Sequence, residues 1–191
     1  FRKKTYLCTD SKTNKDMILL SFDTEEFDVP REHGVDISLE EGMRVSIAGT
    51  TRILDILKAN SVQATFFCTG NFAAHAPHII QRIINEGHEV ACHGVDHWQP
   101  KDDDVFRSKE IVERVAQQPV YGYRQPRMFA VSDHDIQAAG FQYNSSLNPA
   151  FIPGRYMHLR TPRTWFMKDG VMQIPASVSP NLRIPLFWLA L

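Results

Sequence analysis

Short apolar runs separated by polar, turn-forming stretches recur along the first half of the chain. The runs lie at Met17–Phe22, Gln63–Cys68 and His88–Cys92. Four to six consecutive apolar or small residues are typical of strands that are buried on both faces in a parallel sheet. The pattern therefore predicts three buried strands in this part of the chain.

Two stretches have helical spacing instead. The first begins at Pro77, which fits a first helical turn, and ends at Gly87, which fits the left-handed residue that closes a helix. The second follows Lys101–Asp104, whose aspartates we interpret as an N-terminal cap, because they lack the spaced oxygens of a calcium-binding loop. The apolar positions of the two predicted helices are Ile79, Ile80, Ile83, Ile84, Val105, Ile111, Val112 and Val115.

The second half of the chain continues the alternation with weaker signals. It predicts a helix over residues 131–139 that ends at Gly140, a strand over 141–145 and another strand over 171–175. Strands that alternate with helices predict an α/β fold with a parallel sheet. With 191 residues, 43% of them hydrophobic, and no repeats, residues 1–191 are expected to form one domain with a sizeable core.

Polar side chains with metal-binding chemistry follow two of these strands. Asp23 and Glu25 come at the end of the first strand, and alternation places them on one side with Thr24 turned away. Two carboxylates on one face repel each other unless a cation lies between them. His93 and His97 follow the third strand, and imidazoles four positions apart can reach one ion. A solvated loop for the acids and unrelated surface positions for the histidines remain the alternatives.

Three blocks resemble those of the polysaccharide deacetylases, the nodulation-deacetylase-like domain of carbohydrate esterase family 4. They are an acidic block at residues 21–25, a histidine block at residues 87–97 and an arginine block at residues 122–126. The Ala64–Phe67 run also resembles the second strand of the family, so the resemblance extends from residue 17 to about 145. It implies a distorted (β/α)7-type barrel of parallel strands, with the last elements missing from the C-terminal end.

The resemblance also implies roles for individual residues. His93 and His97 are expected to bind one divalent metal ion, with zinc as the expected metal. Asp23 is expected to be the general base, and Arg124 to orient that base and adjust its charge. The expected reaction is the hydrolysis of an N-acetyl group on a carbohydrate by a water that the metal activates.

Two positions depart from the family pattern. The common acidic motif has adjacent aspartates, whereas here Thr24 stands second and Glu25 third, which resembles an acid-x-acid subgroup and makes Glu25 the expected third ligand. After the proline of the arginine block, Pro126, the family usually has tyrosine, but this chain has Arg127. We expect Pro126 and Arg127 to contact substrate, with a backbone N–H still available to an oxyanion.

The general acid of the family has no counterpart in this chain. The family uses a histidine in a Leu-x-His block, and no such block follows the arginine block here. We therefore expect the chain to be a fragment, with His158 or His134 as the alternative acid. His88, by contrast, is expected to be structural.

Charge and cysteine content narrow the possible partners. A net charge of −1 argues against a nucleic-acid partner. We interpret a loose basic cluster as a solvated loop, with contact to an anionic glycan carrier as the alternative. The basic residues of this cluster are Arg155, Arg160, Arg163 and Lys168.

The chain has three cysteines, Cys8, Cys68 and Cys92. We interpret them as buried apolar residues and give Cys92 no ligand role.

No run of 18 apolar residues predicts a transmembrane segment. The N-terminus shows no signal-peptide pattern, although an export signal removed beforehand would leave none. The sequence therefore favours a cytoplasmic location, with the cell envelope as the alternative if a signal was removed.

Two other functions remain open at this point. One is hydrolysis of a different C–N bond, of the allantoinase or deformylase kind, on the same scaffold. The other is a non-catalytic, metal-stabilised domain that binds glycans. Acetate release from N-acetylated oligosaccharides would separate an N-deacetylase from both.

Overall fold

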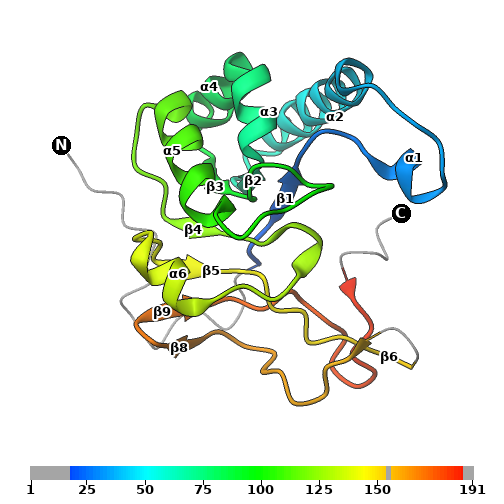
Figure 1. The fold of residues 1–191 in the computed structure, drawn as a ribbon, viewed down its shortest axis with the longest axis vertical. Coiled ribbons are helices and arrows are strands. Elements are labelled where there is room, and N and C mark those ends of the chain that lie inside the picture. Colours follow the sequence, from blue (N-terminus) through cyan, green and yellow to red (C-terminus); the bar gives the residue numbers. More distant parts are fainter. Residues whose placement is uncertain (1–17, 154–155, 187–191) are drawn as a thin grey trace.

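A computed structural model describes residues 18–153 and 156–186 as an α/β structure with one large sheet (Figure 1). The helices are α1 (Val29–Glu32), α2 (Leu39–Ala59), α3 (Gly70–His75), α4 (Pro77–Asn85), α5 (Asp104–Ala116) and α6 (Asp133–Ala138), with a short 3-10 turn, η1, at Pro126–Met128. The strands are β1 (Ser21–Thr24), β2 (Thr65–Cys68), β3 (Glu89–Cys92), β4 (Gly122–Tyr123), β5 (Tyr143–Asn144), β6 (Phe151–Ile152), β7 (Tyr156–Met157), β8 (Phe166–Lys168) and β9 (Val171–Gln173).

The seven-stranded sheet has the order β1-β2-β3-β4-β5-β9-β8. Neighbours from β1 to β9 pair in parallel, and only β8 runs antiparallel to its neighbour. The helices α2 to α5 gather beside β1 to β4 (Figure 1). This order is the one that successive βα units produce.

The core forms where β2 and β3 face these helices. Phe66 and Val90 occupy opposite positions in the β2–β3 pair, and both are buried in the main apolar cluster. Cys68 and Cys92 are also opposite one another, and both side chains are fully buried. Burial raises the pKa of both thiols far above the ordinary range. This confirms that the two residues are buried apolar positions; Cys8 lies outside the described residues.

Two helices, α3 and α4, lie between β2 and β3, and α4 begins and ends as its sequence predicts. Pro77 is the first residue of α4, where a missing N–H leaves no hydrogen bond unmade. Gly87 has φ +86°, the left-handed conformation that a side chain disfavours. Because the chain turns tightly there, β3 begins two residues later, and His93 follows its last residue.

The structure corrects several expectations. The first strand is shifted: β1 covers Ser21–Thr24, while Ile18 and Leu19 are 82% and 68% exposed, so the apolar run is not a buried strand. The sheet is not closed into a barrel, since β1 and β8 are its two end strands over the described residues. The predicted helix over 131–139 is shorter, at α6. The predicted elements do not include α1, α2, α3, β4, the β6–β7 hairpin or β8.

The longest helix in the described part of the chain, α2, has 21 residues. Neither it nor any other described helix combines the length and apolar character needed to cross a membrane.

Candidate metal centre and catalytic site

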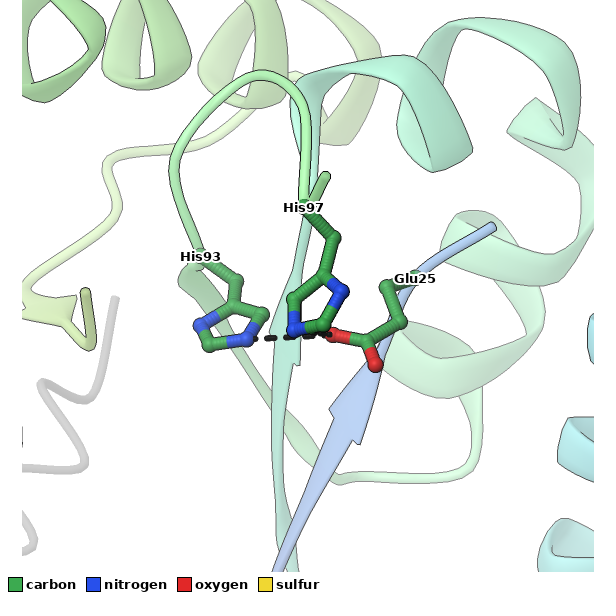
Figure 2. Close-up of side chains that lie close together, drawn as sticks. All are labelled: Glu25, His93 and His97. Atoms are coloured by element: carbon green, nitrogen blue, oxygen red, sulfur yellow. Dashed lines mark ion pairs between the residues drawn. The ribbon is translucent and has the colours of Figure 1, made fainter. Parts of the chain in front are cut away.

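Three side chains with metal-binding atoms converge at the carboxyl ends of β1 and β3 (Figure 2). Glu25 Oε2 lies 3.2 Å from His93 Nε2 and 3.3 Å from His97 Nε2. The ligand atoms of the three residues all lie within 4.8 Å of one another. The structure therefore brings together the three residues that the sequence suggested as ligands.

The loop after β3 sets the positions of both histidines. His93 directly follows the strand, and Gly94 then takes φ +67°. A Cβ atom at Gly94 would stand 2.8 Å from Pro126 Cγ, so a side chain does not fit there. The Gly94 carbonyl accepts a hydrogen bond from the N–H of Gly70 at 2.9 Å, which ties the loop to the start of α3. The backbone is thus held while the two rings face the end of β1.

Hydrogen bonds fix which nitrogen of each ring faces Glu25. His93 Nδ1 donates to the carbonyl of Arg124 at 2.8 Å, and His97 Nδ1 donates to Asp28 Oδ2 at 2.7 Å. In a neutral imidazole, a proton on Nδ1 leaves a lone pair on Nε2. Partners of this kind orient most metal-binding histidines. Both Nε2 lone pairs are therefore directed at the Glu25 carboxylate.

Such a group of lone pairs fits a cation. Glu25 Oε2 is buried and has no hydrogen-bond partner in the described part of the chain. Two ligands about 2.05 Å from a tetrahedral zinc ion lie about 3.3 Å apart, close to the two Glu25–histidine separations. Glu25, His93 and His97 are therefore suited, in chemistry and spacing, to hold a divalent metal ion.

A second acidic residue is turned to the same place. Asp23 Oδ2 lies 3.9 Å from His93 Nε2, and its other oxygen pairs with Arg124 Nη1 at 2.5 Å. Burial alone would raise the pKa of Asp23. Positive charge on a protonated His93, the Arg124 guanidinium and, with a smaller effect, a protonated His97 bring the pKa below its ordinary value instead. Asp23 is thus ionised at neutral pH, and a third of its side chain remains accessible.

Contacts on every side hold Arg124, which is 8% exposed. Its Nε donates to the carbonyl of Ser145 at 3.2 Å, and Nη2 donates to Ser145 Oγ at 2.9 Å and to Ser21 Oγ at 3.1 Å. The guanidinium carbon lies 4.0 Å from the centroid of the Phe67 ring. The Ser145 hydroxyl donates in turn to the carbonyl of Ile174 at 2.9 Å. The guanidinium is therefore locked in the orientation that pairs it with Asp23.

The structure also places three carboxylates around His97, only one of which the sequence had suggested. Besides Glu25 and Asp28, Glu26 accepts a hydrogen bond from the His97 backbone N–H at 3.2 Å. Glu26 also accepts from Thr69 Oγ1 at 2.7 Å and is 7% exposed. The sequence signal was present, since four acids occupy residues 23–28, but their partners were not deducible from it.

Pro126 and Arg127 lie close to this group on η1. Pro126 is buried against Gly94 and is not itself open to a substrate. Arg127 Nη2 pairs with Glu32 Oε1 at 2.7 Å, and its guanidinium carbon lies 5.3 Å from the centroid of the Trp98 ring. Arg127 thus links η1 to α1 and to the residue after His97.

Residues 18–153 and 156–186 show no general acid beside the candidate metal centre. The side chain of His134 is 85% exposed and pairs with its neighbour Asp135. His158 Nδ1 donates to the carbonyl of Asn148 at 2.6 Å. Of the basic cluster, Lys168 pairs with Asp133, and Arg163 donates to the carbonyl of Pro180, while Arg155 lies outside the described residues.

Comparisons with known proteins identify relatives of this chain. The sequence profile of the family described as polysaccharide deacetylase matches residues 10–143. A peptidoglycan-N-acetylglucosamine deacetylase of Bacillus cereus is 38% identical over 74 residues, which are 35% of this chain and 27% of that protein. A chitooligosaccharide deacetylase of Bradyrhizobium is 46% identical over 48 residues, 25% of this chain and 22% of that protein.

The fold has a counterpart among solved structures. A Mycobacterium smegmatis protein, provisionally described as a polysaccharide deacetylase, matches with a TM-score of 0.60 and 24% identity. The match covers 85% of this chain and 58% of that one, so this chain spans well under two thirds of each of these relatives. The family profile covers more than half of the chain and includes every candidate ligand. The chain therefore belongs to the polysaccharide deacetylase family.

Proposed function

We propose that this protein removes N-acetyl groups from an N-acetylated glycan in a reaction that depends on a divalent metal ion, zinc by preference. The observation that carries the proposal is the buried, unpartnered Glu25 Oε2 that faces both Nε2 atoms, with the ionised Asp23 beside them. Two histidines and one carboxylate form a ligand set that zinc enzymes use while leaving a position open for water or substrate.

Each residue has a distinct task in this proposal. Glu25, His93 and His97 would hold the ion, which supplies Lewis-acid polarisation of the scissile carbonyl and lowers the pKa of water. Asp23 accepts the proton of the attacking water, because its carboxylate is ionised and about a third exposed. Arg124 holds the Asp23 carboxylate in place and favours its charged form.

The substrate class is proposed from the relatives. The Bacillus cereus relative is described as acting on peptidoglycan N-acetylglucosamine, and the Bradyrhizobium relative on chitooligosaccharides. Both substrates carry N-acetylglucosamine, so an N-acetylated glucosamine glycan is the substrate class with which to begin. Protonation of the leaving amine requires a further group, for which His158 and His134 are the candidates inside this chain.

Replacing Asp23 tests the proposal. We expect Asp23→Asn to retain the metal, because an amide still accepts a hydrogen bond from Arg124, and to lose at least about 10²-fold in kcat, because it cannot accept a proton. Acetate released from tetra-N-acetylchitotetraose measures turnover, and elemental analysis of the dialysed protein measures the metal.

Matched variants complete the test. The double variant His93→Ala with His97→Ala should lose both metal and turnover, whereas His134→Asn on the exposed face of α6 should keep the metal. Loss of metal in Asp23→Asn would reassign Asp23 as a ligand. Metal-loaded wild type that binds the oligosaccharide but never releases acetate would instead indicate a glycan-binding domain.

A further inference from the structure

A hollow of about 340 Å³ lies next to the candidate metal centre. Its lining residues are Arg31, Gly34, Val35, Asp36, Trp98 and Gln99. Trp98 directly follows His97, and Arg31 lies on α1, whose N-cap residue Asp28 is the hydrogen-bond partner of His97. The hollow therefore adjoins the metal centre on the side of α1, and no role in metal binding accounts for it.

A network of charged groups holds the Trp98 ring at the hollow. The Arg127 guanidinium lies 5.3 Å from the ring centroid and is itself paired with Glu32 on α1 at 2.7 Å. Arg127 and Met128 both have left-handed backbone conformations, with φ +57° and +52°. Residues other than glycine avoid this region, and such strain persists where the surrounding structure requires it. The η1 turn thus keeps Arg127 against an aromatic ring instead of leaving it in solvent.

The groups around the hollow suit a sugar ring. An aromatic face can cover the apolar C–H face of a pyranose, while planar polar side chains reach the hydroxyls at its edge. Arg31 Nη2 donates to the carbonyl of Ile37 at 3.1 Å, but its Nε has no hydrogen-bond partner among the described residues. Asp36 and Gln99 are exposed and add acceptors and donors. Charges of both signs line the hollow, which favours a neutral ligand over an ionic one.

We propose that this hollow is a subsite for a second sugar ring of the glycan, a neutral pyranose that stacks on Trp98. The inference rests on the proposed function, because the first ring is the one whose N-acetyl group lies at the metal. The hollow would make the protein favour oligosaccharides over a single N-acetylated sugar. It also gives Arg127 a task, which is to fix the ring on which the second sugar lies.

Binding without turnover tests the subsite. Calorimetry on the zinc-loaded full chain carrying Asp23→Asn, which the proposed function makes unable to turn over, measures the affinity for tetra-N-acetylchitotetraose and for N-acetylglucosamine. We expect Trp98→Ala to weaken tetrasaccharide binding about tenfold, the order expected for losing one aromatic contact, and to leave monosaccharide binding within about twofold. Trp165→Ala is the matched control, because Trp165 is 65% exposed and does not line the hollow. It should leave both affinities unchanged.

A second variant keeps the test independent of folding. Asp36→Ala removes one exposed hydrogen-bonding group from the hollow and should weaken tetrasaccharide binding by about threefold. Circular dichroism and metal content check that each variant is folded. Unchanged tetrasaccharide affinity in both Trp98→Ala and Asp36→Ala would overturn the proposal. Equal losses for the tetrasaccharide and the monosaccharide would also overturn it, because Trp98 would then contact the reacting sugar.

Acetate release, measured separately, distinguishes this proposal from the proposed function. If tetrasaccharide binding depends on Trp98 but no acetate is released, the subsite proposal is supported and the proposed deacetylase activity is contradicted. If wild type and Trp98→Ala deacetylate the tetrasaccharide with equal kcat/KM, the proposed deacetylase activity is supported and the subsite proposal is contradicted.

Discussion

Three carboxylates contact His97. Glu25 lies beside its Nε2, Glu26 accepts from its backbone N–H, and Asp28 accepts from its Nδ1. The sequence predicted the first of these contacts, because the acid-x-acid resemblance made Glu25 the third ligand beside His97. It did not predict the other two, because β1 ends at Thr24 and the alternation of a strand does not say where the side chains of Glu26 and Asp28 lie. The motifs thus pointed to five residues that the structure brings together, Asp23, Glu25, His93, His97 and Arg124, but not to Glu26, Asp28 and Ser145, which contact them.

Replacing Asp28 should weaken metal binding although Asp28 is not a ligand. Asp28→Ala removes the acceptor that holds the His97 ring and its tautomer, so we expect zinc affinity to fall about 10–100-fold. Asp28→Asn retains an acceptor, so its zinc affinity should fall less. Competition with a chromogenic chelator measures the affinity. Glu41→Ala is the control, because Glu41 is an exposed carboxylate on α2. An equal loss of zinc affinity in Asp28→Ala and Glu41→Ala would show that Asp28 does not support metal binding through His97.

Replacing Ser145 should slow catalysis without changing substrate binding. Ser145→Ala leaves Arg124 without one of the acceptors that lock its guanidinium, so we expect kcat to fall about tenfold, consistent with the loss of a hydrogen bond to a charged group. KM and metal content should stay unchanged, and Ser145→Thr should restore most of the rate because it keeps the hydroxyl. A rise in KM alone would place Ser145 in substrate binding instead.

At the level of elements, the sequence predicted β2, α4 and β3, whereas α2 and α3 were missed. The β2–α4–β3 unit combines continuous apolar runs with a proline at the helix start and a glycine at its end. The start of α2 also has a signal, since the Ser38 side chain accepts a hydrogen bond from the N–H of Glu41 at 3.1 Å. Its inward positions also recur at helical steps of three and four residues, so the signal was present and was missed. These positions are Met43, Ile47, Thr50, Leu54 and Leu57.

His88, at the junction of α4 and β3, is structural, as predicted. The residue is 7% exposed, and the N–H of Ala64 donates to its Nδ1 at 3.3 Å. Its Nε2 has no hydrogen-bond partner in the described part of the chain. Burial lowers the pKa of His88 below its ordinary value, against a smaller opposing effect of Glu86. Protonation of His88 would also break the hydrogen bond from Ala64.

This pKa gives a pH dependence of stability with a definite sign. A lowered pKa in the folded state means that the unfolded chain takes up the proton first as the pH falls below about 6.5. The contribution of His88 is therefore complete above that pH and is lost as the pH falls toward the folded-state pKa.

The His88→Asn variant isolates this effect, because asparagine offers an acceptor to Ala64 but does not titrate. We expect the free energy of unfolding of wild type, relative to His88→Asn, to decrease between about pH 7 and pH 5 in urea titrations. Ionisable groups present in both proteins cancel in the difference. A difference that stays constant, or that grows toward pH 5, would contradict the assignment.

For the whole molecule, the βα alternation predicted the α/β class and the parallel order of the sheet. It could not establish a closed barrel, because closure requires pairing between the first strand and the last, and no local pattern records that pairing. The described strands form an open sheet from β1 to β8.

Metal should stabilise the whole molecule, because the ligands join the ends of two strands that are separated in sequence. A ligand that binds only the folded state, at a concentration about 100 times its Kd, adds about 2.7 kcal/mol. For a chain of this length we expect zinc to raise Tm by about 5–10 °C. Scanning calorimetry with zinc and with a chelator measures the shift. The variant with both His93→Ala and His97→Ala should show none, and an equal shift there would place the ion elsewhere.

The unequal sequence separations within the site bear on how the protein folds. The metal ligands and the partners of His97 all lie within residues 25–97, so pairing of β1, β2 and β3 suffices to bring them together. The Asp23–Arg124 pair spans 101 positions, and Arg124 is held by Ser145 beyond β5. Contacts of greater sequence separation cost more chain entropy and tend to form later. The three ligands can therefore come together on a partly folded chain, whereas the hydrogen bond that orients the His93 ring and the working orientation of the base both require β4, and the base also requires β5.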